Sequence, residues 1–264
     1  TELPPSWNVA PTQPISLVVA TLRPEGAARH RPLTADAATH PGGRPTARAA
    51  GRGGAADAGA PAGAAVTPGE DHQGGPRRLL AAARWGLVPA WSKDPASGPL
   101  LINARSETLT AKPSFRAAAA RRRAIVPANG YYEWAAAGDG PKTPFYLHPD
   151  SGGPLALAAV YEWWRAPTGV RLEGFPISDD GWLCSAAIVT RPATDTLGRI
   201  HDRMPVVVPP ALLGAWLDPT PAGPDEVNGL LAAFPDPALT PRRVGRAVGS
   251  VRNNRPDLIE EAAA

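Results

Sequence analysis

A long stretch without large apolar side chains, residues 24 to 77, most constrains how this 264-residue chain can fold. It consists mostly of Ala, Gly, Pro, Arg and Thr. Such a segment cannot bury enough apolar surface to offset the entropy lost on ordering, so we expect a disordered insertion. Strand-like sequence at 15–22 stops before the insertion and resumes at Leu79. We therefore expect one interrupted domain over residues 1–255 and a short tail over residues 256–264.

Outside this insertion, short apolar runs alternate with turn signals, which is typical of a sheet with many strands. Gly138-Asp139-Gly140 indicates a hairpin between two of these runs. We predict an α+β fold: a curved, mostly antiparallel, barrel-like sheet with peripheral helices. The expected strands cover residues 15–22, 85–91, 100–103, 124–126, 131–135, 144–147, 155–164, 184–190, 205–208 and 244–251, and the expected helices cover 112–123, 209–217 and 225–234.

Composition excludes several classes of site. The lone cysteine, Cys184, rules out an internal disulfide framework and a cysteine-based zinc site. It lies in an apolar strand, where we expect a raised thiol pKa and low reactivity. The formal net charge of +3 is compatible with a polyanionic partner. No apolar run reaches the roughly 18 residues of a membrane span, and no signal peptide is recognisable. We expect a cytoplasmic protein.

Glu133 is the central candidate for chemistry. It stands between Tyr132 and Trp134 in an apolar run. A carboxylate in such surroundings either pairs with a cation or has a raised pKa and can carry protons. The structural alternative is a core salt bridge, for which Arg105 would serve as the partner.

Three polar side chains could complete a site around this carboxyl group. Asn103 and Arg105 flank Ala104 on an extended segment, so their side chains share one face. Together they could hold a phosphate or carboxylate, or brace a loop. His201 titrates near neutral pH and could exchange protons with a substrate, or be a structural histidine.

Other residues have structural alternatives that compete with nucleic-acid binding. Tryptophans could stack on bases, and Trp91, on a turn, is the candidate that we expect to be most exposed. Most of the candidates, which are Trp85, Trp91, Trp134, Trp163 and Trp164, are expected in the core. Arg121-Arg122-Arg123 is expected to be a solvated helix end, favoured there by the helix dipole. His30, His40 and His72 are expected to be solvated loop residues.

Taken together, several blocks of this sequence resemble the SRAP family, the SOS response-associated peptidases. The similarity covers nearly all of the chain outside the insertion and the tail. The order and spacing of the blocks carry it: WNVAPTQ at 7–13, RWGLVPAW at 84–91, INARSET at 102–108, RRAIVPANGYYEW at 122–134, IHDRMPVV at 200–207 and RAVGSVRNN at 246–254.

The resemblance implies a protein that binds abasic sites in single-stranded DNA and cross-links to them. Its nucleophile would be an N-terminal cysteine, exposed by autoproteolytic removal of the initiator Met, and the product would be a thiazolidine. No cofactor or metal is implied, and the protein would be a monomer associated with the nucleoid. The implied catalytic residues are Glu133, His201 and Asn103, and the implied DNA or phosphate contacts are Arg105, Asn8, Trp91, Trp85 and Thr190.

The chain departs from the family pattern at its start. Family members begin Met-Cys-Gly-Arg, whereas this sequence begins at Thr1. We expect the sequence as printed to bind DNA weakly and not to cross-link, because the nucleophile and one phosphate-binding arginine are missing from it. Two alternatives stay open: a noncatalytic module that binds single-stranded DNA, and a peptidase that acts on other proteins.

Overall fold

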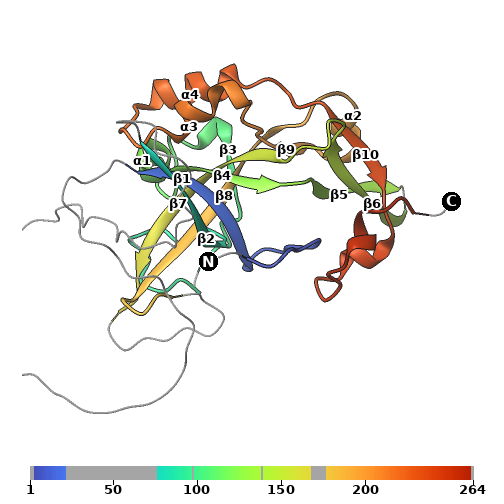
Figure 1. The fold of residues 1–264 in the computed structure, drawn as a ribbon, viewed down its shortest axis with the longest axis horizontal. Helices are drawn as coiled ribbons and strands as arrows, with labels where there is room; N and C mark the ends of the chain where they lie inside the picture. Colours follow the sequence, from blue (N-terminus) through green and yellow to red (C-terminus); the bar gives the residue numbers. More distant parts are fainter. Residues whose placement is uncertain (1–2, 22–75, 97, 138, 168–176, 263–264) are drawn as a thin grey trace, which may run out of the picture.

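A computed structural model describes most of the chain outside the expected insertion (Figure 1). Apart from Pro76 and Arg77, the segment 24–77 and its three histidines lie outside the described residues. The described residues are 3–21, 76–96, 98–137, 139–167 and 177–262.

Five strands close into a barrel-like sheet. Around the sheet, β1 lies between β2 and β4, β4 pairs with β7, and β7 pairs with β8, all antiparallel. The sheet closes where β8 runs parallel to β2, pairing Arg84 with Ser185 and Trp85 with Ala186. This arrangement confirms the predicted fold class. The strands are β1 (Pro14–Thr21), β2 (Arg77–Trp85), β4 (Arg123–Ala128), β7 (Leu155–Arg165) and β8 (Trp182–Pro192).

Alternating side chains separate the inside of this barrel from its outside. In β8, Ala186 and Ile188 belong to one buried cluster, whereas Ala187 and Val189 belong to another. The period of two follows from strand geometry, which points successive side chains to opposite faces. The second cluster includes residues of α1 and α4, such as Ala118, so the helices cover this outer face.

Short helices pack on the outer face and fix the ends of the barrel. Trp216 is fully buried there, donates from Nε1 to the carbonyl of Ala124 over 2.8 Å, and meets Phe234 edge-on. The α-helices are α1 (Arg116–Arg121), α2 (Asp195–Ile200), α3 (Leu213–Leu217) and α4 (Pro224–Ala233), and the 3₁₀ turns are η1 (Ser106–Thr108), η2 (Pro210–Leu212), η3 (Arg246–Gly249) and η4 (Pro256–Ile259).

A second sheet stands beside the barrel, in the order β10–β6–β5 (Figure 1). Its strands are β5 (Tyr131–Ala137), β6 (Gly140–Pro149) and β10 (Leu239–Arg243). Tyr132 and Trp134 face a small cluster built by Tyr146, Val248 and their neighbours. Tyr131 packs instead against the barrel cluster, so Glu133 shares this barrel-facing side of β5.

Two short strands pair with the C-terminal end of β8. β3 (Asn103–Arg105) runs parallel to β8, and β9 (Arg203–Pro205) runs antiparallel to it. Thr190 connects them, because it pairs with Arg105 across one edge and with Pro205 across the other. Since neighbouring strands lie about 4.8 Å apart, β3 and β9 are about 10 Å apart across β8.

The expected closing strand at 244–251 is wrong. β10 ends at Arg243, and residues 246–249 form a 3₁₀ turn. Val244 and Val248 pack into the same cluster, and a spacing of four puts two side chains on one face in a strand as well as in a helix, so the sequence pattern did not distinguish the two.

Two other expected elements are shorter than predicted. In the segment 85–91 only Trp85 is in a strand, because Gly86 adopts a φ of +126° that breaks the extended backbone. The helix expected over 112–123 covers only Arg116–Arg121. The expected helix at 209–217 consists of a 3₁₀ turn followed by α3.

The expectation that Arg121, Arg122 and Arg123, at the end of α1, are all solvated is also wrong. Arg122 donates to Glu162 over 2.7 Å, and Arg123 is 4% exposed. Arg123 donates to the carbonyls of Ala119 and Ala120 at the end of α1. It therefore caps the helix from inside the protein and satisfies carbonyls that have no intrahelical partner.

Candidate active site

Glu133 and His201 lie against each other where the second sheet meets α2. Glu133 is on β5, and His201 follows directly after the end of α2. The Nδ1 atom of His201 is 4.0 Å from Oε1 of Glu133 and 3.2 Å from Oδ1 of Asp202. The backbone N–H of Arg203 donates to the same ring nitrogen over 3.1 Å. This geometry places a carboxyl group and an imidazole close enough for both to contact one small reacting group.

The surroundings of Glu133 favour its protonated form. Its side chain is 23% exposed, and burial raises the pKa of the carboxyl group, an effect that the nearby imidazole of His201 partly opposes. Burial and the charge of Glu133 also raise the pKa of Tyr131. The imidazole of His201 is the neighbour of Glu133 at 4.0 Å, and within the described residues no ion pair joins Glu133 to Arg105, so the core salt bridge considered above is wrong.

Asn103 and Arg105 form a polar edge on β3. Both residues are exposed, and Ala104 between them is completely buried, as the extended spacing predicts. Neither side chain makes a hydrogen bond or ion pair with the part of the chain that the structure describes. A free amide and a free guanidinium on one strand face are suited to bind an anionic group from solvent.

An ion pair that sequence reasoning missed connects this edge to His201. Arg203 donates from Nη1 to Oε1 of Glu107 over 2.6 Å and from Nη2 to Oε2 over 3.0 Å. Its Nη2 also donates to the carbonyl of Thr190 over 2.7 Å. Glu107 is two positions after Arg105, and Arg203 is two positions after His201. This spacing was a signal in the sequence that could have identified both as neighbours of the site.

This ion pair should affect stability at acid pH. The hydrogen bonds from Arg203 lower the pKa of Glu107 from 4.5 to about 2. A depressed carboxyl pKa contributes stability that is fully present above pH 4.5 and is lost as the pH falls through about 2. We therefore expect Glu107→Gln to remove part of the acid-induced loss of stability in this range. Chemical denaturation at pH 2 to 6 would measure it, and an unchanged pH profile would contradict the assignment.

The other expected contacts occupy different environments. Trp91 is 69% exposed, which confirms the prediction that it is the most exposed of the candidate tryptophans. Trp85 donates from Nε1 to the carbonyl of Ile102 and so braces the segment that leads into β3. Thr190 is 7% exposed and contacts Arg203 through its carbonyl and hydroxyl oxygens.

Asn8 and Cys184 are both buried. The side-chain amide of Asn8 donates to the carbonyls of Val248, Ser250 and Asn253, each over 3.1 Å. Asn8 thus joins the N-terminal segment to the C-terminal turn. Burial raises the thiol pKa of Cys184 to about 12, which confirms the expected shift.

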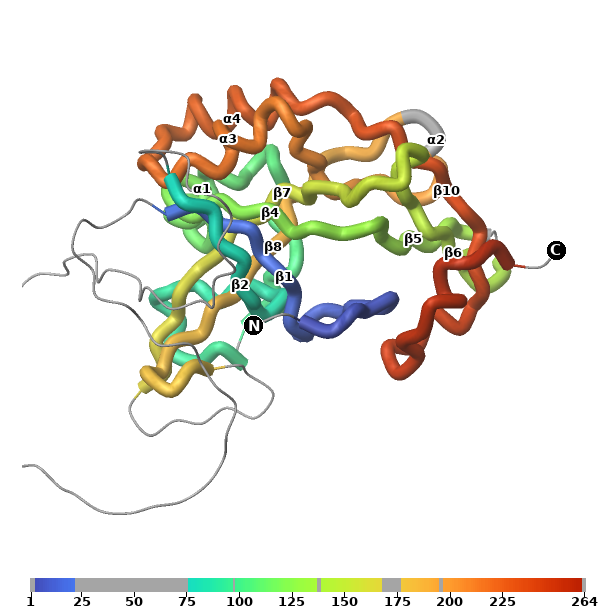
Figure 2. The backbone as a smooth tube through the Cα atoms, in the orientation of Figure 1, coloured from blue at the N-terminus to red at the C-terminus, as the bar shows by residue number. Residues whose placement is uncertain are grey.

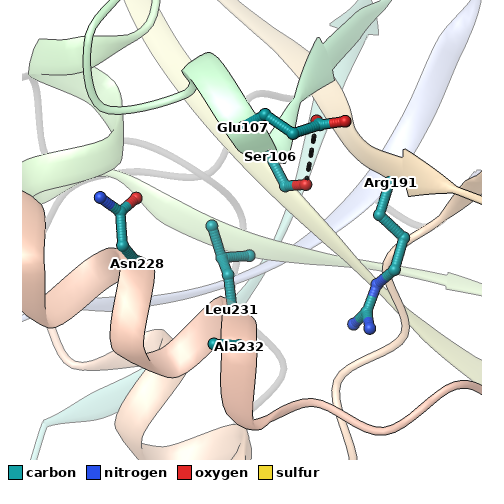
Figure 3. A pocket seen from close by; sticks show the side chains of 6 residues that line it. All are labelled: Ser106, Glu107, Arg191, Asn228, Leu231 and Ala232. Atoms are coloured by element: carbon teal, nitrogen blue, oxygen red, sulfur yellow. Dashed lines mark hydrogen bonds between the residues drawn. The ribbon is translucent and has the colours of Figure 1, made fainter.

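A shallow hollow lies between η1, β8 and α4, next to Glu107 (Figure 3). Its polar side chains already have partners in the protein: Glu107 binds Ser106 and Arg203, and Arg191 binds the carbonyl of Phe234. We therefore place the candidate site at Glu133 and His201. The hollow is lined by Ser106, Glu107, Arg191, Asn228, Leu231 and Ala232.

Comparison with known families tests the resemblance noted above. The family model described as "SOS response associated peptidase (SRAP)" matches residues 1–251. The chain belongs to the SRAP family. All the residues that form the candidate site lie inside the matched range.

Named relatives of this SRAP protein share one description. The abasic site processing protein YoqW of Bacillus subtilis (strain 168) is 37% identical over 186 residues, which are 70% of this chain and 78% of YoqW. The abasic site processing protein YedK of Escherichia coli (strain K12) is 34% identical over 178 residues, which are 67% of this chain and 72% of YedK.

Solved structures support the fold of this SRAP chain. A crystal structure of a protein from Bacteroides thetaiotaomicron matches with a TM-score of 0.55 at 24% identity, covering 70% of this chain and 77% of that chain. At this identity the similarity concerns the fold alone. In the described residues, no helix is long and apolar enough to cross a membrane, and no group of three potential metal-ligating His, Cys, Asp or Glu side chains comes together.

Proposed function

We propose that this SRAP protein processes abasic sites in single-stranded DNA by forming a covalent cross-link with the opened sugar. One observation carries the proposal: a half-buried carboxyl group with a raised pKa, Glu133, lies 4.0 Å from the imidazole of His201. Such a pair suits proton transfer to and from the oxygen and nitrogen atoms of a carbonyl group that reacts with an amine. The relatives are named abasic site processing proteins, which supports the processing of abasic sites as the function.

Asn103 and Arg105 would hold the DNA. They are exposed, lie on one face of β3, and have no partner in the described part of the protein. A guanidinium donates two parallel hydrogen bonds to a phosphate, which fixes the position of the backbone beside the lesion. Asn103 can donate to or accept from the sugar oxygens, since an amide group offers both functions. Trp91, on an exposed turn, offers a surface on which a base could stack.

The reaction needs an amine and a thiol on one terminal residue. The amine attacks the aldehyde carbon of the opened abasic sugar and forms a carbinolamine. Loss of water gives an imine, and the thiol then adds to the imine carbon while the imine nitrogen takes up a proton. The balanced product is a thiazolidine, with one water released for each cross-link.

Glu133 would supply the proton that makes the carbinolamine hydroxyl leave as water. Its raised pKa keeps a protonated fraction available at higher pH than for a solvated glutamate. His201, beside it, would carry protons during opening of the sugar ring and restore the proton on Glu133.

The nucleophile of this reaction would be a cysteine at the natural N-terminus, as the family resemblance implies. Cys184 does not fit this role. It is internal, so it has no α-amine, and burial raises the pKa of its thiol to about 12. We therefore direct every test of covalent chemistry to the natural-length protein after removal of its initiator Met.

Arg105→Gln should weaken binding to single-stranded DNA. Loss of one phosphate contact removes a charge-assisted hydrogen bond, so the slope of log affinity against log salt should fall by about 0.7. Fluorescence anisotropy with a short single-stranded oligonucleotide at several salt concentrations measures both effects. Arg116→Gln, which changes an exposed arginine on α1, is the matched control. Equal salt slopes for Arg105→Gln and wild type would remove Arg105 from the interface.

The direct test of the proposed function uses two oligonucleotides that differ only at the lesion. One carries a natural abasic site, and the other carries a tetrahydrofuran analogue that cannot open to an aldehyde. We expect a denaturation-resistant adduct with the first oligonucleotide only. Binding of both without any adduct would leave a noncatalytic single-strand binding protein.

A further inference from the structure

One row of residues crosses the second sheet from its outer edge to Glu133. Phe145 of β6 pairs with Glu133 of β5 on one side and with Arg243 of β10 on the other. Residues directly opposite each other in neighbouring strands point their side chains to the same face. Glu133, Phe145 and Arg243 therefore share one face, and the backbones of β5 and β10 are about 10 Å apart along this row. Figure 2 shows β10, in orange-red, beside β6 and β5.

The packing of the sheet agrees with this direction of the Arg243 side chain. Leu239 is four positions before Arg243 in β10, so both lie on one face of the strand. Leu239 and Tyr131 both pack against the barrel cluster, which is the side that Glu133 faces. Arg242, in contrast, pairs with Tyr146, which belongs to the small cluster on the opposite face. The two neighbouring arginines of β10 therefore serve opposite faces of the sheet.

The guanidinium of Arg243 is available to a ligand from solvent. The residue is exposed, and its side chain makes no hydrogen bond or ion pair within the described ranges of the chain. Its backbone is fixed, because its carbonyl accepts from the N–H of Ala262 over 2.9 Å and the next N–H, that of Val244, donates to the carbonyl of Pro144 over 3.1 Å. A charged fork on a fixed strand end is suited to bind a phosphate.

The charges around this face leave Arg243 free to attract an anion. Burial is the largest influence on Glu133 and raises the pKa of its carboxyl group, which favours the neutral form. The charge of Lys142, an exposed residue of β6, reaches the same carboxyl group and lowers this pKa. The other acidic groups close by are Asp202, whose side chain is 87% exposed, and Glu261, which is bridged to the residue after Arg243. Neither forms an ion pair with Arg243 in the described structure.

Glu133 and His201 lie between Arg243 and the polar edge of β3. Arg105 pairs with Thr190 of β8, and β9 pairs with the other edge of β8. His201 is two residues before β9 and lies against Glu133, whereas Arg243 is two strands beyond Glu133. A polyanionic chain that passes the catalytic pair can therefore meet one unpaired arginine on each side of it.

We propose that Arg243 binds a DNA phosphate on the opposite side of the abasic sugar from the phosphate bound by Arg105, so that the lesion is held between two arginine contacts. This inference rests on the proposed function. Phosphates of one strand are spaced by about 3.4 Å of rise in a duplex and by more in an extended strand. A distance of about 10 Å then places the phosphate bound by Arg243 within about three linkages of the lesion.

The test combines protein variants with a scan of single phosphates. Each oligonucleotide carries a tetrahydrofuran analogue, so that binding is measured without covalent chemistry, and one neutral methylphosphonate at one of the first three linkages on either side of it. Wild type, Arg243→Gln and Arg105→Gln are compared as natural-length proteins by fluorescence anisotropy. Arg242→Gln removes the same charge from the opposite face of β10 and is the matched control. Glutamine keeps an N–H donor for the carbonyl of Ile259, which Arg242 binds.

We expect one methylphosphonate to weaken wild-type binding about fivefold or more, and to change binding of Arg243→Gln by less than about twofold, because the contact is already lost. Arg105→Gln should lose its response to a linkage on the other side of the lesion. Arg242→Gln should respond like wild type at every linkage. The salt slope of Arg243→Gln should fall by about 0.7. Its melting temperature should stay within about 2 °C of wild type, as for a surface substitution.

Two results would overturn the placement of Arg243. Responses identical to wild type at every linkage would show that Arg243 binds no particular phosphate. Loss of response in Arg243→Gln and Arg105→Gln on the same side of the lesion would show that the two arginines do not flank it. The proposed function fails separately: wild-type protein that binds this DNA but gives no adduct with a natural abasic site would remove cross-linking and leave the Arg243 contact as measured. Wild-type protein that does not bind single-stranded DNA would overturn both.

Discussion

Glu133→Gln is expected to slow cross-linking to an abasic oligonucleotide by about 100-fold or more, the usual contribution of general acid catalysis. The substitution keeps the shape of the side chain and its site on β5 but removes the proton that helps the carbinolamine hydroxyl leave. DNA affinity should change little, since Asn103 and Arg105 are untouched. Single-turnover gel assays of the natural-length protein would measure the rate.

Stability and pH dependence distinguish this role from a structural one. Because burial raises the pKa of Glu133, its charged form destabilises the folded state as the pH rises above the ordinary carboxyl pKa. Glu133→Gln should therefore melt at the same temperature as wild type or higher. The decline of the wild-type rate above the pKa of Glu133 should disappear in the variant. Glu260→Gln, an exposed control, should change neither property. A wild-type rate in Glu133→Gln would exclude Glu133 from the chemistry.

Arg123→Met is expected to cause the largest loss of stability. The guanidinium of Arg123 donates to four carbonyls, those of Ala119, Ala120, Trp216 and Asp218, at 2.6 to 2.9 Å. Methionine fills much of the volume but satisfies none of these acceptors. The carbonyl of Ala120 keeps a second donor, the backbone N–H of Ala222. Leaving the other acceptors without Arg123 should cost about 3 kcal/mol, with part of the loss offset because burial of the charge is no longer needed.

The melting temperature of Arg123→Met should accordingly fall by roughly 6 to 12 °C in a protein of this size. Thermal melting by circular dichroism would measure the change. Arg116→Met, which alters an exposed arginine on α1, the helix whose end Arg123 caps, should stay within about 2 °C of wild type, as expected for a surface substitution. Equal melting temperatures for the two variants would show that the hydrogen bonds from Arg123 to these carbonyls do not stabilise the folded protein.

Local sequence patterns predicted the strands because their information is local. In β7 and β8, runs of apolar and small residues long enough for a strand are bounded by turn signals, and these boundaries are close to those observed. Closure of the barrel through Arg84 and Ser185 depends on chain segments 101 residues apart, for which no local pattern exists. The wrong prediction of a strand at 244–251 has the same origin, because the position of Val248 is set by packing against residues distant in the sequence, such as Tyr146.

The candidate site was predictable as a set of residue types but not as a set of pairs. Glu133 and His201 stood out as a carboxylate in an apolar run and an isolated histidine, yet their proximity comes from contact between α2 and β5. Sequence reasoning left open a pair between Glu133 and Arg105, whereas the structure pairs Glu107 with Arg203. Long charged side chains choose partners across strands, and the order of residues along the chain does not specify that choice.

The most direct test of the proposed function is the intact mass of the natural-length protein before and after mixing with a single-stranded abasic oligonucleotide. The account predicts a protein that lacks its initiator Met and begins with cysteine. It then predicts a new species heavier by the mass of the oligonucleotide less one water. A protein with this cysteine-first terminus that binds the oligonucleotide but gains no mass would contradict the cross-linking function.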